Sequence, residues 1–424
     1  MSTLQNPSTR AARRSLAPPT APETEIRPVI GPVREQFIPL RKSDLVETLA
    51  SLPELGHGEG DAFRRLCCLV HGLVHRDYQA TLEELKDDYA PFDPDADTRR
   101  GGELTPEELD DRRGKLFERF NWLLQRGNFT HLDRGEIERA LGNCSQWGLN
   151  LAVDFKIFDR LEIYARGDVT GKRTRRRLRK LFRPEVVDLP MYQRLVVIFR
   201  LRPSRQISRV LDTHDVYIKI FKEIPKPDLD MLLPGTQVRM SLFDRAKIVL
   251  PTLSGVSIAI WKMVQGAFLV AAAGFYGSMA FLGLVGGTLG YGVRSFYGYL
   301  NTKQKYQLNL TQSLYYQNLD NNAGAIFRLL DEAEEQESRE AMLAYFYLWR
   351  SAPPHGWRTE ELDAHIEAFL RTAAERDVDF EVGDAMAKIE RLQIVEPCPG
   401  GKWRAVPIDK ALRVLERRWA ILPD

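Results

Sequence analysis

One nearly uncharged stretch decides the interpretation of this chain: residues 248–293 read IVLPTLSGVSIAIWKMVQGAFLVAAAGFYGSMAFLGLVGGTLGYGV, and Lys262 is its single charged residue. The hydrocarbon core of a bilayer is about 30 Å thick and takes about 20 apolar residues per helix. The 46 residues of this stretch therefore fit two membrane spans and a tight turn at Gln265-Gly266. We predict a transmembrane helical hairpin over residues 246–294, and a buried hairpin in a soluble core is the alternative.

Small residues recur at three and four spacing along the second predicted span, residues 267–293. Small side chains let helix backbones approach closely in lipid, where the hydrophobic effect gives little drive for association. The predicted packing face contains Gly277, Gly283, Gly287 and Gly290. This face would pack against the first span, against a second copy in a homo-oligomer, or against nothing specific.

Basic residues flank both ends of the predicted hairpin, whereas only Lys262 marks its turn. An excess of Lys and Arg favours the cytoplasmic or matrix side of a membrane. Both flanking regions are therefore predicted to lie on that side of a bacterial cytoplasmic membrane. The mitochondrial inner membrane is the alternative.

Hydrophobic periodicity divides the rest of the chain and predicts an α+β, mostly α, fold. Residues 1–35 have no acidic residue before Glu23 and are rich in Ser, Thr, Ala and Pro, which predicts a disordered leader with a transit peptide as the alternative. Four regions complete the chain: an α-helical domain over 36–150, an antiparallel α+β sheet domain over 151–245, a long helical segment over 295–352 and a winged-helix-like module over 353–424. In the helical domain we expect Ser43 and Thr105 to be N-caps.

The charge distribution limits the classes of partner. A formal net charge of +2, from 60 basic and 58 acidic side chains, disfavours a whole-protein nucleic-acid binder. Eight of the twelve residues 172–183 are nonetheless basic, and such a cluster suits anionic lipid head groups. The predicted head-group contacts are Arg173, Arg175, Arg176, Arg177, Arg179 and Lys180. Nucleic acid and a solvated strand edge are the alternatives.

The helix expected over residues 381–392, in the recognition position of the winged-helix-like module, carries a net negative charge. Phosphates would repel it, so we expect this module to bind protein or its own chain rather than DNA.

Two clusters of possible metal ligands have simpler interpretations. Cys67, His71 and His75 fall at i, i+4 and i+8 of a predicted helix, but no fourth ligand is evident and a packed helix with boundary histidines is favoured. The acidic run from Glu332 to Glu340 is interpreted as a solvated helix face. We predict no metal, no cofactor and no catalytic residue.

A compact polar cluster follows the hairpin. Its members are Asn318, Asp320, Asn321 and Asn322. Because this cluster exceeds the needs of a helix cap, we predict a partner or ligand site there. Local capping and turn bonds are the alternative.

Several motifs resemble those of the transmembrane protein 143 family, also known as domain of unknown function 3754. The most specific segments are residues 216–235, which begin VYIKIFKEIP, and residues 314–349, which begin LYYQNLDNN. The resemblance covers residues 36–420. It implies paired soluble regions around two membrane spans, and it brings no established catalytic residues.

Together these patterns predict a two-span integral membrane protein that acts as a non-enzymatic, membrane-anchored scaffold or interaction protein. Its expected partners are the lipid bilayer and an unknown protein, and no nucleic acid. The alternative function is an oligomeric pore or transporter subunit assembled through the second span. The lack of charged residues at depth counts against an ion pathway.

Overall fold

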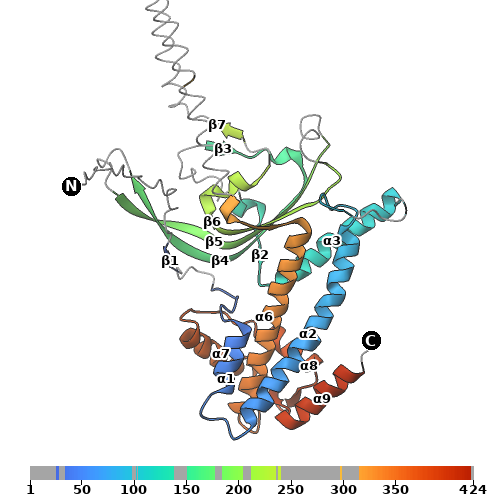
Figure 1. Ribbon diagram of the computed structural model, residues 1–424. Coiled ribbons are helices and arrows are strands. Elements are labelled where there is room, and N and C mark those ends of the chain that lie inside the picture. Colours follow the sequence, from blue (N-terminus) through green and yellow to red (C-terminus); the bar gives the residue numbers. More distant parts are fainter. Residues whose placement is uncertain are drawn as a thin grey trace, which may run out of the picture.

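The computed structural model describes the side chains of residues 34–97, 102, 104–137, 153–171, 188–203, 212–229, 231–234, 297 and 315–421, and the backbone alone of residues 25–27, 150–152, 172–176, 184–187, 230 and 237–239. The described chain is α+β and mostly helical, with an antiparallel sheet, and this part of the predicted fold class is confirmed (Figure 1).

Three long strands form the centre of the main sheet: β4 (Phe158–Arg176), β5 (Pro184–Leu201) and β6 (Tyr217–Pro225). The strand order is β1-β4-β5-β6-β8, with β1 (Glu25–Arg27) and β8 (Asn318–Asn321) at the edges and β2 (Thr130–His131) also paired with β4. A separate two-stranded sheet joins β3 (Asn150–Ala152) to β7 (Gln237–Arg239), and two short 3-10 helices are η1 (Phe155–Ile157) and η3 (Lys226–Leu232).

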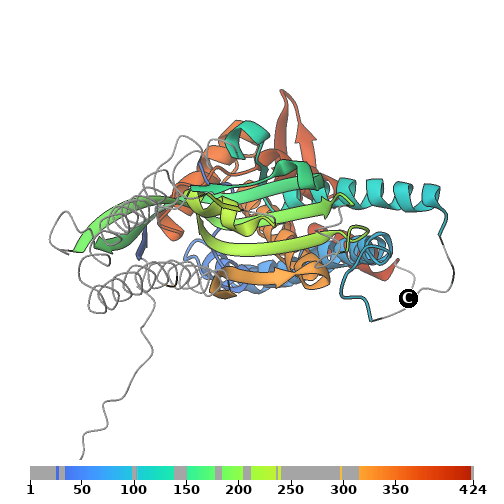
Figure 2. The same cartoon turned by 90° about the horizontal axis from the view of Figure 1, so that it is seen from above.

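Four helices extend away from one face of the sheet: α1 (Lys42–Ala50), α2 (Glu59–Tyr89), α3 (Pro106–Arg126) and α6 (Asn322–Arg350) (Figures 1 and 2). Thr105 caps α3 in a capping box with Glu108, so the predicted cap is confirmed. The predicted cap at Ser43 is wrong, because α1 begins one residue earlier and Arg41 occupies the N-cap position.

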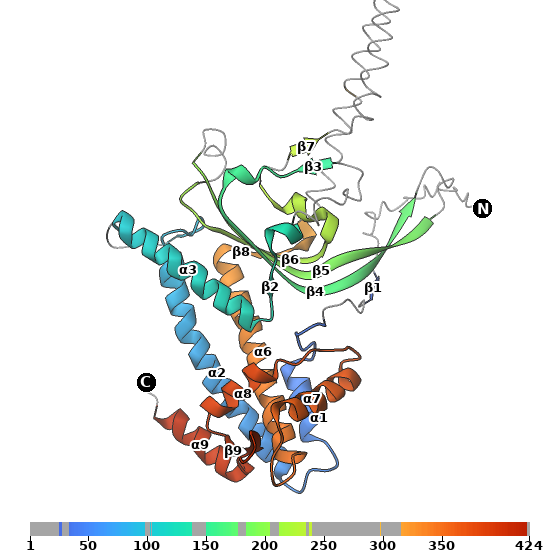
Figure 3. The ribbon, with the colours of Figure 1, turned by 180° about the vertical axis from the view of Figure 1, so that it is seen from behind.

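The C-terminal module comprises α7 (Thr359–Ala373), α8 (Val382–Arg391), the hairpin β9 (Val395–Cys398) and β10 (Lys402–Ala405), and α9 (Ile408–Ala420) (Figure 3). Gly356 has φ +76, and a Cβ there would lie 2.5 Å from the carbonyl oxygen of Trp403, so the chain needs glycine where residue 357 pairs with residue 403. Helix α8 packs against α6, and Asp384 and Arg391 form salt bridges to Arg126 of α3 and Asp77 of α2. The helix in the recognition position is therefore engaged with its own chain.

One hydrophobic core connects most of these elements. The sheet residues Tyr164, Val196, Ile198, Ile218 and Ile220 belong to the same buried cluster as side chains from α2, α3, α6 and the C-terminal module. Helix α6 lies at the centre of this cluster and contacts α2, α8, α3, α7 and α1. A second, smaller core covers the opposite face of the sheet.

The membrane prediction needs correction. Among the residues that the structure describes, no helix is both long and apolar enough to cross a membrane. The two longest described helices, α2 and α6, carry charged residues along their length, and each such residue at the bilayer centre costs about 3 kcal/mol. This finding overturns the two-span integral membrane protein, its location in the bacterial cytoplasmic or mitochondrial inner membrane, and the anchored-scaffold and pore functions. The predicted hairpin at 246–294, with its glycine face, lies outside the described residues.

Candidate functional site: a basic cleft under the sheet

The helix-facing side of the sheet changes from apolar to basic towards one end of its strands. Tyr164, Val196 and Ile220 pair across β4, β5 and β6 and lie in the hydrophobic core. Two residues further along each strand, on the same face, the next row is Arg166, Arg194 and Lys222. Like charges directly opposite each other destabilise a sheet, so anionic groups near this row would stabilise it.

Arg166 is a buried anchor in this row, with 7% of its surface exposed. Its guanidinium lies 4.0 Å from the ring centroid of Phe37 and 4.4 Å from that of Phe129. It donates to the carbonyl of Gly127 at 3.0 Å and to Glu332 of α6 at 2.7 Å. Burial lowers the pKa of Arg166, and the Glu332 carboxylate opposes this shift. These contacts hold the cation in one position.

Arg339 of α6 approaches the same aromatic ring. Its guanidinium is 5.1 Å from the Phe37 centroid, and it donates to the carbonyl of Leu40 at 3.2 Å and to Glu335 at 3.3 Å. Arg339 is 5% exposed, yet its buried Nε has no hydrogen-bond partner among the residues that the structure describes. Because buried polar atoms are nearly always paired, this unsatisfied donor is a feature that needs an explanation.

A cleft of about 610 Å³ opens beside these two arginines, and we call it the basic cleft. Its charged lining residues are six cations and three carboxylates: Arg41, Lys42, Arg166, Arg194, Arg339 and Arg376, with Glu223, Glu332 and Glu335.

Most of the carboxylate charge in the basic cleft is already engaged. Glu332 pairs with Arg166, and Glu335 pairs with Lys42 at 2.8 Å and with Arg339. Within the described part of the chain, no salt bridge joins Arg41, Arg194 or Arg376 to a carboxylate.

Arg194 of the sheet row makes fewer hydrogen bonds than Arg166. Its Nη1 donates to the carbonyl of the neighbouring Gln193 at 3.0 Å, and its buried Nε has no partner within the described part of the chain. Gln193 in turn packs against Gly167, where φ is +74 and a Cβ would lie 2.6 Å from the Gln193 Oε1. The local backbone therefore holds Gln193 close to β4, while Arg194 lines the cleft.

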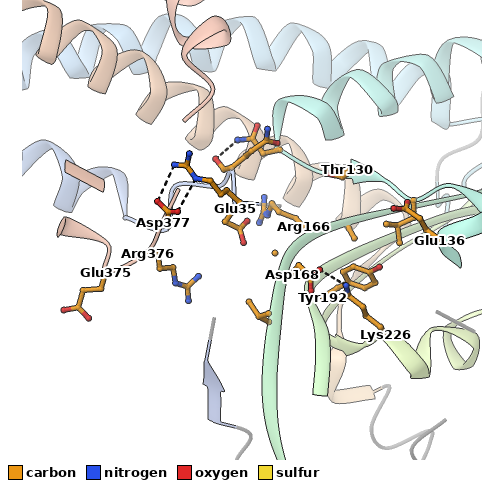
Figure 4. Close-up of a pocket in the computed structure, with 17 residues that line it drawn as sticks. Glu35, Thr130, Glu136, Arg166, Asp168, Tyr192, Lys226, Glu375, Arg376 and Asp377 are labelled. Carbon is orange, nitrogen blue, oxygen red and sulfur yellow. Dashed lines mark hydrogen bonds and ion pairs between the residues drawn. The ribbon is translucent and has the colours of Figure 1, made fainter. Parts of the chain in front are cut away.

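A second hollow of about 420 Å³ adjoins the basic cleft, and Arg166 and Arg376 line both (Figure 4). Its other charged residues are mainly acidic, and Lys226 is paired with Asp168 at 2.6 Å. Burial raises the pKa of Glu35 in its wall, whereas the charges of Arg166 and Arg376 lower it. The excess of positive charge thus belongs to the basic cleft alone.

Residues 34–43, which we call the N-terminal segment, join the cleft to the C-terminal module. Arg34 pairs with Glu367 of α7 at 2.7 Å and donates to the carbonyl of Val378 at 2.7 Å. The carbonyl of Glu35 accepts from the backbone of Asp379 at 2.8 Å. These contacts fix the α7–α8 loop beside the cleft and so place Arg376 in its wall.

The predicted polar cluster lies elsewhere. Asn318 to Asn321 form edge strand β8, and none of the four cluster residues lines either hollow. Asn322 has φ +49; its Oδ1 accepts from the backbone of Ile218 at 3.2 Å and its Nδ2 donates to Asp95 at 2.6 Å. These bonds join the start of α6 to β6 and to Asp95, and the partner or ligand site at the cluster stays a prediction.

The acidic run of α6 is not the solvated face that the sequence suggested. Glu334, Glu337 and Glu340 are 5%, 4% and 3% exposed, because α6 is surrounded by other helices and each carboxylate meets a polar partner. His75 lies 2.9 Å from Glu334, Arg126 lies 3.0 Å from Glu337, and Asn128 donates to Glu340 at 3.3 Å.

The histidine-containing face of α2 is similarly engaged. His71 lies 2.9 Å from Lys42, and Cys67 is buried. The structure, over the residues it describes, contains no group of three His, Cys, Asp or Glu side chains that could hold a metal ion.

The basic run at 173–180 lies outside the described side chains, and only its backbone through Arg176 is described, as part of β4. Its proposed contact with anionic lipid therefore stays a prediction.

The comparisons with known proteins add a family for part of the chain. Residues 192–324 match the family model described as protein of unknown function (DUF3754). No solved structure matches this protein. The matched residues support an uncharacterised-domain family, and they include Arg194, Lys222 and Glu223 of the basic face, whereas Arg166, Arg339 and Arg376 lie outside the match.

Proposed function

We propose that this protein is a receptor for a small organic anion, which binds in the basic cleft. The observation that supports this function is the surplus of cations in a partly buried wall: three arginines make no salt bridge to a carboxylate of the described residues, beside two buried arginines that are already fixed. An anion would neutralise this charge, and a cleft of this volume suits a small molecule.

The preorganisation of the cleft favours binding. Arg166 and Arg339 both lie against Phe37, and each already makes several hydrogen bonds, so they supply a fixed positive potential without losing side-chain freedom when a ligand arrives. Arg194 and Arg376 are then the groups that would contact the anion directly.

We also propose a more specific family for the whole chain. The motifs at 216–235 and 314–349 support placing the whole chain in the transmembrane protein 143 family, although the matched model covers residues 192–324. We also propose that the chain binds a protein partner and forms a homo-oligomer.

Thermal unfolding of the full chain with a panel of anions tests the receptor function. The panel contains glycerol 3-phosphate, succinate, citrate and AMP. A ligand at 100 times its Kd stabilises the folded state by about 2.7 kcal/mol, so at least one anion should raise the Tm, and above its Kd the stabilisation should grow with the logarithm of the anion concentration.

The variant Arg194→Gln should lose this stabilisation, because it removes a cation without a carboxylate partner. Arg200→Gln is the matched control: Arg200 lies on the same strand and is paired with Asp159 at 3.0 Å, outside the cleft. Equal stabilisation of Arg194→Gln and the wild-type protein would overturn the proposal, and so would a Tm that no anion raises.

A further inference from the structure

We infer that the anion is a phosphate monoester whose phosphate bridges Arg194 of the sheet and Arg376 of the C-terminal module. This inference rests on the proposed receptor function and adds the chemical class of the ligand and a mechanical consequence of binding.

The number and type of cations point to a phosphate. A phosphate monoester carries a charge of about −1.5 to −2 at neutral pH and three strong acceptor oxygens, whereas a single carboxylate carries one charge and two oxygens. The basic cleft has six cations against three carboxylates, and five of the six cations are arginines. Guanidinium groups offer paired donors that match phosphate oxygens.

The positions of the lining arginines fit an anion bound at several points. Arg194 lies on the sheet side of the basic cleft and Arg339 on its α6 side. Both residues line the same cleft, together with Arg376. An oxyanion with three acceptors can be approached from several walls at once.

The bridge follows from where Arg194 and Arg376 are attached. Arg194 belongs to β5, whose register is fixed by pairing with β4 and β6. Arg376 belongs to the α7–α8 loop, which the N-terminal segment ties down through Arg34 and Glu35. A phosphate between them would connect the sheet to the C-terminal module and restrain that loop.

Isothermal titration calorimetry and hydrogen exchange on the full chain test both parts of the inference. We expect glycerol 3-phosphate to bind at least tenfold more tightly than succinate. Arg194→Gln and Arg376→Gln should each weaken glycerol 3-phosphate at least tenfold, whereas Arg200→Gln and Arg413→Gln, an exposed residue of α9, should not. Ligand should slow amide exchange over residues 374–381 in the wild-type protein and not in Arg376→Gln.

The outcomes separate this inference from the receptor function. If succinate binds as tightly and depends on Arg194, the phosphate class is overturned and the receptor function stands. If glycerol 3-phosphate binds but Arg376→Gln changes neither affinity nor exchange, the bridge is overturned. If neither the soluble anions nor vesicles that contain phosphatidic acid bind, both proposals fail.

The phosphate could belong to a soluble metabolite or to a lipid head group. Vesicles that contain phosphatidic acid, compared with vesicles of phosphatidylcholine alone, distinguish these sources. Arg194-dependent sedimentation with phosphatidic acid, without binding of glycerol 3-phosphate, assigns the phosphate to a lipid. Binding of glycerol 3-phosphate in solution assigns it to a small molecule.

Discussion

Glu340 of α6 is a carboxylic acid that the fold keeps away from water. Gln336 and Asn128 donate to its Oε1 at 2.6 and 3.3 Å, yet burial raises the pKa of Glu340 to about 8. In the unfolded chain the pKa returns to about 4.3, so the folded state binds one more proton between these values. The contribution of Glu340 to stability is therefore complete below about pH 4 and is lost as the pH rises towards 8.

This proton linkage predicts the behaviour of Glu340→Gln. As the pH rises from about 4 towards 8, the free energy of unfolding of the wild-type protein should fall by up to about 1.4 kcal/mol per pH unit. The amide oxygen of the variant can accept the same two hydrogen bonds but does not ionise, so the variant should not show this fall. Urea unfolding at pH 5.5 and 7.5 measures the difference, with Glu118→Gln, an exposed position of α3, as the control. If the wild-type protein and Glu340→Gln show the same pH dependence, Glu340 is not protonated in the folded state.

At the scale of the element, Asn322 fixes the junction between β8 and α6. Its left-handed backbone and its two side-chain bonds, to Ile218 of β6 and to Asp95, align the start of the central helix with the sheet. Asn322→Ala should destabilise the protein by about 2–4 kcal/mol. It loses the hydrogen bonds of the Asn322 side chain, and alanine adopts a positive φ less readily than asparagine does. Asn322→Gly should cost less, since glycine adopts this φ without strain.

Urea unfolding of the two variants separates the backbone effect from the hydrogen bonds. Asn321→Ala is the control, because Asn321 is exposed and such a substitution typically changes stability by less than about 0.5 kcal/mol. Equal stability of Asn322→Ala and the wild-type protein would show that the junction does not depend on this side chain.

Some of the helices and strands could be predicted from the sequence, and others could not. Apolar spacing and the Thr105-Pro106 start predicted α3 correctly, because these signals are local. Strand β8 was missed, since four polar residues form it only through pairing with β6. The burial of Glu334, Glu337 and Glu340 was missed for the same reason: their partners come from α2, α3 and the loop after α3.

The sequence contains a pattern that indicates the basic cleft, but the pattern can be recognised only when the register of the strands is known. Arg166 follows Tyr164, Arg194 precedes Val196 and Lys222 follows Ile220, each at a spacing of two. This alternation places each cation on the core face of its strand, but only the pairing of β4, β5 and β6 aligns them in one row. Arg339 and Arg376 reach the row through packing, which no local pattern encodes.

At the scale of the whole molecule, the sheet and the helices share one hydrophobic core, and this predicts how they unfold. Ile218 of β6 is fully buried in the cluster that includes α2, α3, α6 and the C-terminal module. Ile218→Ala should therefore lower the stability of the helices as well as the sheet, by about 2–5 kcal/mol. Circular dichroism at 222 nm, which reports mainly helix, should show the shift in a urea titration.

Leu189→Ala is the matched comparison, because it removes the same number of carbon atoms from a different place. Leu189 is buried with Val169 and Met191 in a small separate cluster on the β4–β5 hairpin. Local opening there can occur without unfolding the main core, so the helical signal of Leu189→Ala should shift by less than that of Ile218→Ala. If Ile218→Ala leaves the urea midpoint of the signal at 222 nm unchanged, the sheet unfolds independently of the helices. In that case a ligand that bridges Arg194 and Arg376 would join two separately stable units rather than two parts of one.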